Sequence, residues 1–225
     1  MSDEENLIDV NSLVALGPER LATLLAEVAM TNSYMRRRLQ FELAAQKGEN
    51  VSAAVHQWIG ELGEQTSLLD AEQFGELAGE LDAIRGAIVS SVFRAEPKLG
   101  PDLMWQIFTL AGTLFERTTE EGWEVSRVFD QACSDLVEMS VDADVEPKVF
   151  AVKVVAAISS NRYGEYGALI RAISAQPCAS SYVCEIRNLL QRLVGEPPGP
   201  NGSPNSERGH VLRRALHELD SRSAT

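Results

Sequence analysis

Apolar residues recur every three or four positions along most of the chain, which is the spacing of one face of an α-helix. The pattern is clearest between Glu124 and Met139, where an apolar stripe alternates with charged and polar positions. Further segments with this spacing follow three proline residues and occupy two stretches between residues 51 and 93. We therefore predict an all-α protein in which each helix buries about a third of its surface against its neighbours.

Three of the predicted helices begin with a proline beside an acidic residue, at Pro18, Pro101 and Pro147. Proline suits the first helical turn because its missing N–H would find no acceptor there, and the acid complements the helix dipole. The prolines lie 83 and 46 residues apart, and 83 is close to twice the HEAT-repeat length of about 40–47 residues. This spacing predicts stacked antiparallel helix pairs, a HEAT-like α-solenoid. A compact helical bundle is the alternative.

Two segments are less regular than the rest. The stretch Val149–Val155 has strand propensity, but the chain offers no second extended apolar stretch to pair with it. We predict a largely buried helix there, because burial overrides local preference. A helix is also expected from Tyr163 to Ile173, where Tyr166 and Leu169 share its apolar face.

The C-terminal part differs in composition from the rest. Residues 1–194 are expected to form the helical repeat-like domain, and residues 195–209 form a linker rich in Pro, Gly and Ser, which makes a flexible tail. A short amphipathic helix is predicted at 210–221. A helix of this length is marginal in water by itself, so it must dock on this chain or on another molecule. Its apolar stripe is Val211, Leu212, Leu216 and Leu219.

The formal net charge of −13 is concentrated in the middle of the chain, where residues 51–100 carry 8 acids and 3 bases and residues 101–150 carry 11 acids and 3 bases. Such a surface repels phosphate, which disfavours nucleic acid as a partner. It either keeps the protein soluble, the simpler explanation, or attracts a basic protein. The acids between Glu61 and Asp82 occur without an intervening base, which is typical of a solvated helix face, with a docking surface as the alternative.

The chain has no apolar stretch near the roughly 20 residues that a membrane span needs. Its acidic beginning lacks the basic and apolar regions of a secretory signal, so we expect a cytoplasmic protein. Cys133, Cys178 and Cys184 are an odd number without zinc-site spacing, and we expect them to be buried or half-buried thiols.

The three histidines, His56, His210 and His217, are not set beside a nucleophile or an acid in any familiar catalytic pattern. Phosphate-binding loops and zinc-protease motifs are also absent. We expect no metal, no cofactor and no enzymatic activity, although an active site assembled from distant positions is the alternative.

Two predicted turns, at 115–123 and 161–167, gather aromatic and charged side chains. Equivalent turns line up along one edge of a stack of helix pairs, so they would form a binding rim for a protein partner. The simpler explanation is that the aromatic residues cap the packing between helices. The candidate partner-binding residues are Glu116, Arg117, Trp123, Arg162, Tyr163, Glu165 and Tyr166.

Several of these blocks look familiar: 17–22 followed by Arg36-Arg37-Arg38-Leu39, then 115–117, 125–129 and 162–166 with 169–170. They resemble a widespread bacterial family of unknown function, over roughly residues 13–175. The resemblance implies an all-helical, repeat-like protein and carries over no catalytic residue. The linker and the terminal helix look particular to this chain.

The leading hypothesis from these observations is a non-enzymatic α-helical scaffold or adaptor that binds a protein partner, which the charge suggests is basic. The alternative is an acidic inhibitor or immunity-type protein that neutralises a basic toxin or a nucleic-acid-binding partner. A third hypothesis is an enzyme with a dispersed site. The sequence leaves the oligomeric state open.

Overall fold

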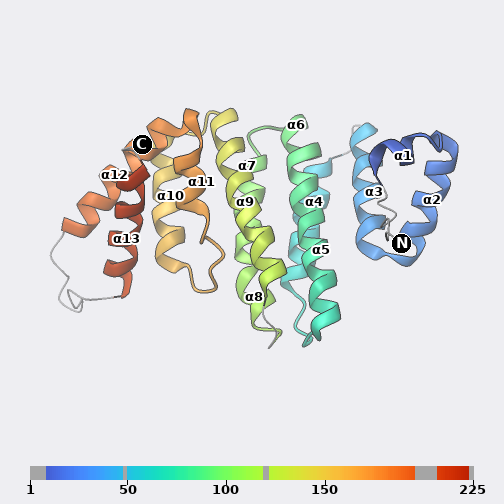
Figure 1. Ribbon diagram of the computed structural model, residues 1–225, viewed down its shortest axis with the longest axis horizontal. Helices are drawn as coiled ribbons and strands as arrows, with labels where there is room; N and C mark the ends of the chain where they lie inside the picture. The colour runs from blue at the N-terminus through green and yellow to red at the C-terminus, as the bar shows by residue number, and fades with distance from the viewer. Residues whose placement is uncertain (1–8, 48–49, 119–121, 196–206, 223–225) are drawn as a thin grey trace, which may run out of the picture. The chain divides into compact units, whose positions relative to one another are not determined.

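The computed structural model describes residues 9–47, 50–118, 122–195 and 207–222 (Figure 1). Every regular element in these ranges is a helix, which confirms the all-α prediction. None of the described helices is both long and apolar enough to cross a membrane. The chain divides into two compact units, Met1–Glu49 and Asn50–Thr225, where the sequence predicted one helical domain over 1–194.

The first unit contains α1 (Val10–Val14), α2 (Pro18–Thr31) and α3 (Ser33–Gln46). Pro18 occupies the first turn of α2, as predicted. Phe41 is the one buried residue among those whose side chains are described in this unit. The apolar stripe of α2 is therefore not buried, and the expectation that each helix buries its stripe is wrong here, because three short helices offer too few neighbours.

The second unit begins with the two helices predicted between 51 and 93, and its later helices include the segment Val149–Val155, which is helical as expected. A π-helical turn, Ile88–Val92, joins the second of these helices to a short third one, and a 3-10 turn, Pro177–Ala179, lies near the C-terminal end. The helices are α4 (Val51–Gly63), α5 (Ala71–Ala87), α6 (Phe93–Ala95), α7 (Gly100–Thr109), α8 (Ala111–Phe115), α9 (Trp123–Asp142), α10 (Pro147–Ser160), α11 (Leu169–Ala175), α12 (Ser180–Gly195) and α13 (Glu207–Arg222).

The helix predicted from Tyr163 begins only at Leu169, so the prediction is wrong for residues 163–168. These residues form turns instead. Gly164 has φ +85°, a left-handed conformation that glycine adopts without strain, and its carbonyl oxygen accepts a hydrogen bond from Gly167 N at 2.8 Å. Leu169, Ile170 and Ile173 do share a buried helical face, as the apolar spacing predicted. Gly164 and Gly167 lie in the turns before this helix.

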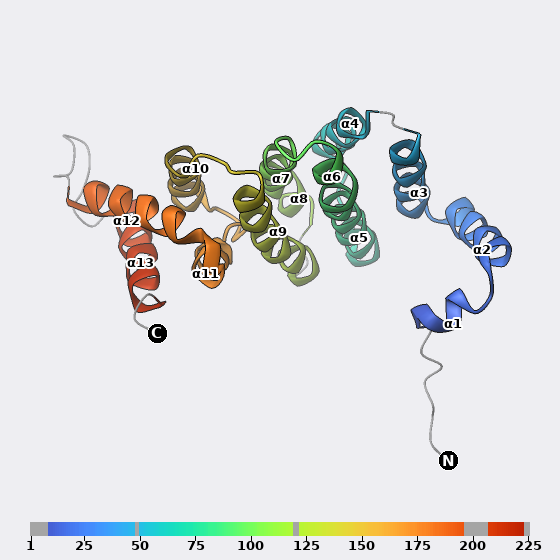
Figure 2. The same ribbon diagram turned by 90° about the horizontal axis from the view of Figure 1, so that it is seen from above.

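The helices of the second unit pack in two rows. Figure 2 shows α4, α7 and α10 along one side and α5, α9 and α11 along the other. The tightest neighbours include α5 with α9, α7 with α9, and α10 with α12. Trp58 on α4 is buried, and its indole N–H donates to Glu80 on α5 at 2.6 Å, which joins the two rows. The core between the rows is rich in aromatic side chains, including Phe108, Phe129 and Phe150.

The terminal helix, predicted at 210–221, spans Glu207–Arg222 as α13 and packs on α10, α11 and α12 of the same chain. Leu212 and Leu219 are buried, whereas Val211 and Leu216 are only partly covered. Arg187 on α12 donates from Nε to Asp220 at 2.9 Å. The helix therefore docks on its own chain. Most of the predicted linker, residues 196–206, lies outside the described residues, and 207–209 are helical.

Leu219→Ala is expected to lower the free energy of unfolding by about 2–5 kcal/mol, because a fully buried leucine side chain is replaced by a cavity. Urea denaturation followed by far-ultraviolet circular dichroism measures this loss. Leu68→Ala is the matched control: Leu68 is 81% exposed, so its truncation should change stability by no more than about 0.5 kcal/mol. Equal effects of the two substitutions would contradict the docking of α13.

Candidate functional site

A hollow of about 430 Å³ lies between α5 and α9, which places it in the size range of ligand-binding clefts. We call it the α5–α9 hollow. Its floor on α5 has small side chains, and its walls are charged or polar. The lining residues are Gly75, Ala78, Gly79, Asp82, Arg85, Glu124, Arg127, Val128 and Gln131.

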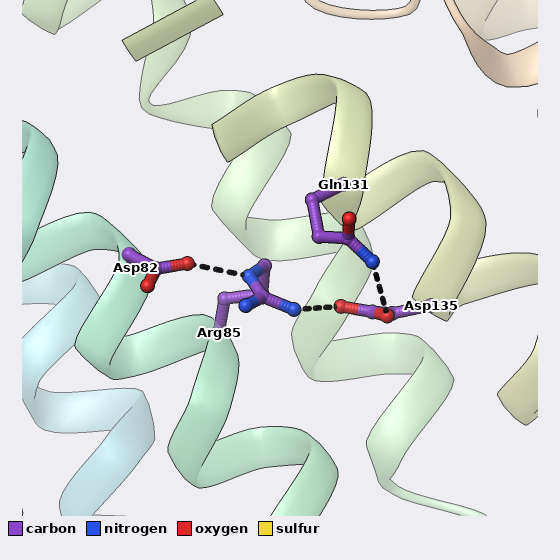
Figure 3. A network of polar contacts seen from close by, with 4 residues as sticks. All are labelled: Asp82, Arg85, Gln131 and Asp135. Atoms are coloured by element: carbon purple, nitrogen blue, oxygen red, sulfur yellow. Dashed lines mark hydrogen bonds and ion pairs between the residues drawn. The ribbon is translucent and has the colours of Figure 1, made fainter. Parts of the chain in front are cut away.

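Arg85 holds the two walls of this hollow together (Figure 3). Its Nε donates to Asp82 Oδ1 on the same helix at 2.8 Å, and its Nη1 donates to Asp135 Oδ2 on α9. Gln131 Nε2 donates to the other oxygen of Asp135 at 3.2 Å. One guanidinium therefore joins two carboxylates from two helices, and an amide supports the more buried of them.

Burial alone would lower the pKa of Arg85, because it penalises the charged form. The hydrogen bonds to Asp82 and Asp135, with the negative charge of both groups, outweigh burial and raise that pKa. Arg85 is therefore a permanent cation. Asp135 is only 9% exposed, so its charge is compensated inside the protein, whereas the side chain of Asp82 is half exposed and faces water as well.

The α5 and α9 helices run in the same direction. Near the start of both helices, the point where a Cβ would lie on Gly75 is 3.2 Å from Glu124 Oε2. Further along both helices, Arg85 meets Asp135. Residue numbers rise together in these two contacts, so the helices are parallel, and the hollow follows their shared groove.

A second hollow, of about 350 Å³, lies on the other side of α9 and is bounded by α11. Arg127 and Gln131 line both hollows, so α9 forms a ridge between them. An exposed ion pair between Arg171 Nη2 and Asp130 Oδ2, at 3.8 Å, crosses this second hollow. We call it the α9–α11 hollow. Its lining residues are Arg127, Asp130, Gln131, Ser134, Ala168, Arg171, Ala172 and Ala175.

Three of the residues predicted for a binding rim do meet. The hydroxyl of Tyr163 donates to Glu116 Oε1, and Arg162 Nη1 lies 4.0 Å from the same oxygen. The Arg162 guanidinium also lies 5.4 Å from the centre of the Tyr163 ring. The hydrogen bond to Glu116 raises the pKa of Tyr163. The two predicted turns therefore lie side by side, with a small exposed polar cluster where they meet.

Arg117 faces the interior, so it is not available at the surface. Its Nε donates to the carbonyl oxygen of Ser67 at 2.8 Å, and Leu69 N donates to the carbonyl oxygen of Arg117 itself. Burial lowers the pKa of Arg117. Its Nη1 is buried without a hydrogen-bond partner among the described residues. Arg117 therefore ties the 64–70 loop to the end of α8.

Glu165 is buried and Tyr166 is half-buried, so neither offers a fully exposed side chain to a binding rim. Glu165 is buried, and its Oε2 accepts from Tyr163 N at 2.8 Å, which closes the turn. The Tyr166 ring packs 4.9 Å from Phe108 and 6.1 Å from Trp105, centre to centre. Burial raises the pKa of Tyr166 from 10.0 to about 12. Tyr166 therefore packs against aromatic side chains of α7, in line with the packing explanation, and Glu165 closes the turn.

Trp123 is 62% exposed at the start of α9, one position before Glu124, which lines the α5–α9 hollow. The guanidinium of Arg127 lies 5.9 Å from the centre of its ring. Trp123 therefore belongs with the α9 ridge, and the polar cluster around Tyr163 is a separate group.

Arg85 lies three residues beyond the predicted acidic run, which ends at Asp82, and is not among the candidate residues predicted from the sequence. The pattern contains one indication of its role: Arg85 is the one base on α5 among four acids. Its partner Asp135, however, is 50 residues away. Sequence periodicity does not show which acid of α9 it meets.

The chemistry of the described residues is limited. They contain no group of three His, Cys, Asp or Glu side chains arranged to hold a metal ion. Cys133 is buried as expected, and burial raises the pKa of its thiol. The expectation is wrong for Cys178 and Cys184, which are exposed. Cys184 lies two positions after the buried Tyr182 on α12, which turns it to the opposite face.

Comparison with known proteins places the chain in one family. A family model described as "Family of unknown function (DUF6880)" matches residues 4–220. The resemblance seen in the sequence blocks is thereby confirmed, and it extends further than 13–175. The linker and most of the terminal helix lie within the match, so the expectation that they are particular to this chain is wrong. No curated protein and no solved structure matches the chain.

Asp135→Asn is expected to lower the free energy of unfolding by about 1–3 kcal/mol, because Arg85 loses a charged partner inside the protein. Asp82→Asn removes the half-exposed partner of the same guanidinium, and solvent screening limits its effect to about 1 kcal/mol or less. Urea denaturation of both variants measures the difference. A larger effect of Asp82→Asn would contradict the assignment of Asp135 as the main partner.

The free energy of unfolding is expected to fall at alkaline pH, and Tyr166→Phe is expected to make this fall smaller. The folded-state pKa of Tyr166 lies above its unfolded value, so its contribution is present below about pH 10 and is lost as the pH rises to about 12. Unfolding free energies measured by urea at several pH values in this window test the effect. If the unfolding free energies of wild type and Tyr166→Phe depended on pH in the same way, the raised pKa assigned to Tyr166 would be wrong.

Proposed function

The chain belongs to this family of unknown function, and we propose that it is a non-enzymatic α-helical scaffold that binds a protein partner on the α9 ridge and its two flanking hollows. The observation that carries the proposal is that Arg127 and Gln131 line both hollows. A partner that enters either hollow contacts the same two side chains. The ridge stands on helices, which hold its side chains in place better than loops would.

The finer architecture that we propose is a stack of helix pairs, in which α4–α5 is followed by α7–α9. Several long-range contacts support it because they join residues separated by similar distances in the chain. A hydrogen bond joins the side chains of His56 and Gln106, which are 50 residues apart in the chain. Arg85 and Asp135, which also form a hydrogen bond, have the same separation. Further along, Lys153 pairs with Asp102 and Tyr163 with Glu116, at separations of 51 and 47. Equivalent positions in neighbouring repeats have this relationship.

The period that these contacts support is close to 50 residues, longer than the 46-residue spacing between Pro101 and Pro147. The parallel direction of α5 and α9 also supports the stack, because equivalent helices of consecutive pairs run the same way. In such a stack, α13 covers the last pair and acts as a cap. We therefore propose a structural role for α13 in place of a free partner-binding arm.

The chemistry of the α5–α9 hollow supports binding over catalysis. Its lining contains no serine, cysteine or histidine to act as a nucleophile or as a base near neutral pH. Arg85 is held by two carboxylates, and both oxygens of the more buried one, Asp135, already accept hydrogen bonds from Arg85 and Gln131. Rigid, fully paired groups of this kind stabilise a surface and leave its exposed neighbours to recognise a partner.

A second candidate function is an acidic inhibitor or immunity-type protein that neutralises a basic partner. The charge of α5 and α9 favours it: together they carry nine acids and two bases. Both candidates place the partner on the same face. They differ in whether binding blocks an activity of the partner, which an assay of the captured partner would distinguish.

Gln131→Trp is expected to abolish capture of the partner, because a bulky ring on the ridge obstructs both hollows without changing the charge. The measurement is quantitative mass spectrometry of proteins captured by the tagged full chain from extracts of its source cells. Gln191→Trp makes the same exchange at an exposed position of α12 and is the matched control. Proteins captured equally by both variants would show that the ridge is not the binding surface.

A further inference from the structure

The first unit has almost no core of its own. Phe41 is its one buried residue among those whose side chains are described. On α2, Leu21 and Leu24 are half-buried, and Leu25 and Val28 are 40% and 45% exposed. A unit of fewer than about 70 residues rarely gains enough from a single core, and oligomerisation is a common remedy. An apolar stripe left open along a whole helix therefore indicates a surface that another molecule covers.

One edge of this stripe carries two opposite charges. Arg20 and Glu27 are seven residues apart, close to two helical turns, so they lie on the same edge, beside Leu24. Both side chains are exposed, and neither forms an ion pair in the part of the chain that the structure describes. These two charges are therefore available to a partner that approaches the stripe from this edge.

The opposite edge of the stripe is the one that α3 approaches. Ala29 lies on this edge and is half-buried. Its carbonyl oxygen accepts a hydrogen bond from Arg36 Nε of α3 at 2.8 Å, and the two helices pack against each other. Helix α3 thus covers α2 from the Ala29 side, which leaves the edge with Arg20 and Glu27 open for a further helix.

The spacing of the two free charges is self-complementary. When two copies of α2 run antiparallel around a two-fold axis near Leu24, Arg20 of each copy lies opposite Glu27 of the partner subunit. Charged residues that flank an apolar stripe in this way fix the orientation of paired helices. The stripe residues of the two copies then meet between two equivalent ion pairs.

The local charge also favours self-association at this unit. Helices α2 and α3 carry three acids and four bases, whereas residues 50–225 carry 25 acids and 15 bases. Two copies can therefore approach through α2 without the repulsion that the acidic helices of the second unit would impose. The pairing brings together four helices, α2 and α3 from each copy, which is a common way for short helices to enclose an apolar core.

We propose that α2 is the interface between two copies of this chain, paired antiparallel, with the open apolar stripe at its centre and an ion pair between Arg20 and Glu27 of the partner subunit at each end. The occupant of the stripe is thus the same stripe of a second copy. This interface lies in the first unit and does not depend on the α9 ridge of the scaffold proposal.

The first test is analytical ultracentrifugation of the full chain over a range of concentrations, which is expected to give twice the mass of one chain. Val28→Glu places a charge in the stripe and should shift the protein to the mass of a single chain. Val152→Glu makes the same exchange at a 59% exposed position of α10 and should leave the dimer intact. A wild-type chain of single mass at every concentration would overturn the proposal.

The second test reads the orientation of the two copies. Arg20→Glu and Glu27→Arg each place like charges opposite one another, so each should raise the Kd of the dimer by about fivefold or more. Mixing these two variants should restore the wild-type Kd, because each copy then carries the charge that the other lacks. Fluorescence energy transfer between labelled chains measures the Kd. Both residues are exposed, and far-ultraviolet circular dichroism checks that each variant keeps its fold.

The remaining outcomes also decide the proposal. A dimer that Val28→Glu leaves unchanged forms through another surface, which rejects α2 as the interface. A dimer that Val28→Glu disrupts, but that does not recover when the charge variants are mixed, rejects the antiparallel pairing. Loss of partner capture in Gln131→Trp concerns the ridge alone, since that substitution should leave the mass of the dimer unchanged.

Discussion

Helix α5 packs against α9, and their row packs against the row of α4, α7 and α10. This packing determines where the other features of the second unit lie. Leu81 and Ile84 on α5, and Phe129 and Leu136 on α9, are fully buried. Burial of such side chains supplies most of the favourable free energy of folding. Each helix carries its apolar stripe on one side. When α5 and α9 pack through these sides, the residues beside the two stripes lie along the edge that the helices share. The hollow and its polar walls are consequences of that alignment.

The same alignment creates an electrostatic cost, since it brings the carboxylates of Asp82 on α5 and Asp135 on α9 to the same place. Arg85 reduces this cost at the point where burial is greatest, through its contacts with Asp82 and Asp135. Other carboxylates of the two helices have partners nearer the surface, since Glu80 accepts from Trp58 and Asp130 pairs with Arg171. Glu124 is exposed and faces water.

The turns and the terminal helix complete this framework from its edges. Arg117 and Glu165 satisfy backbone groups in neighbouring loops, which fixes the ends of α8 and α11. Helix α13 covers apolar surface of α10, α11 and α12 and buries Leu219. These contacts hold the helices that carry the ridge in place.

The sequence by itself determined the helices, because a repeat of three and four apolar positions is a local property of the chain. It also identified Val149–Val155 as helical and brought Glu116 and Tyr163 into one expected region. Tertiary structure decided the rest. Arg117 and Tyr166 turned inward because neighbouring loops and rings offered them partners, and Arg85 met Asp135 across 50 residues. Helical periodicity specifies which side of a helix is apolar. Which polar groups then face one another depends on how separate helices align, and only the packed chain sets that alignment.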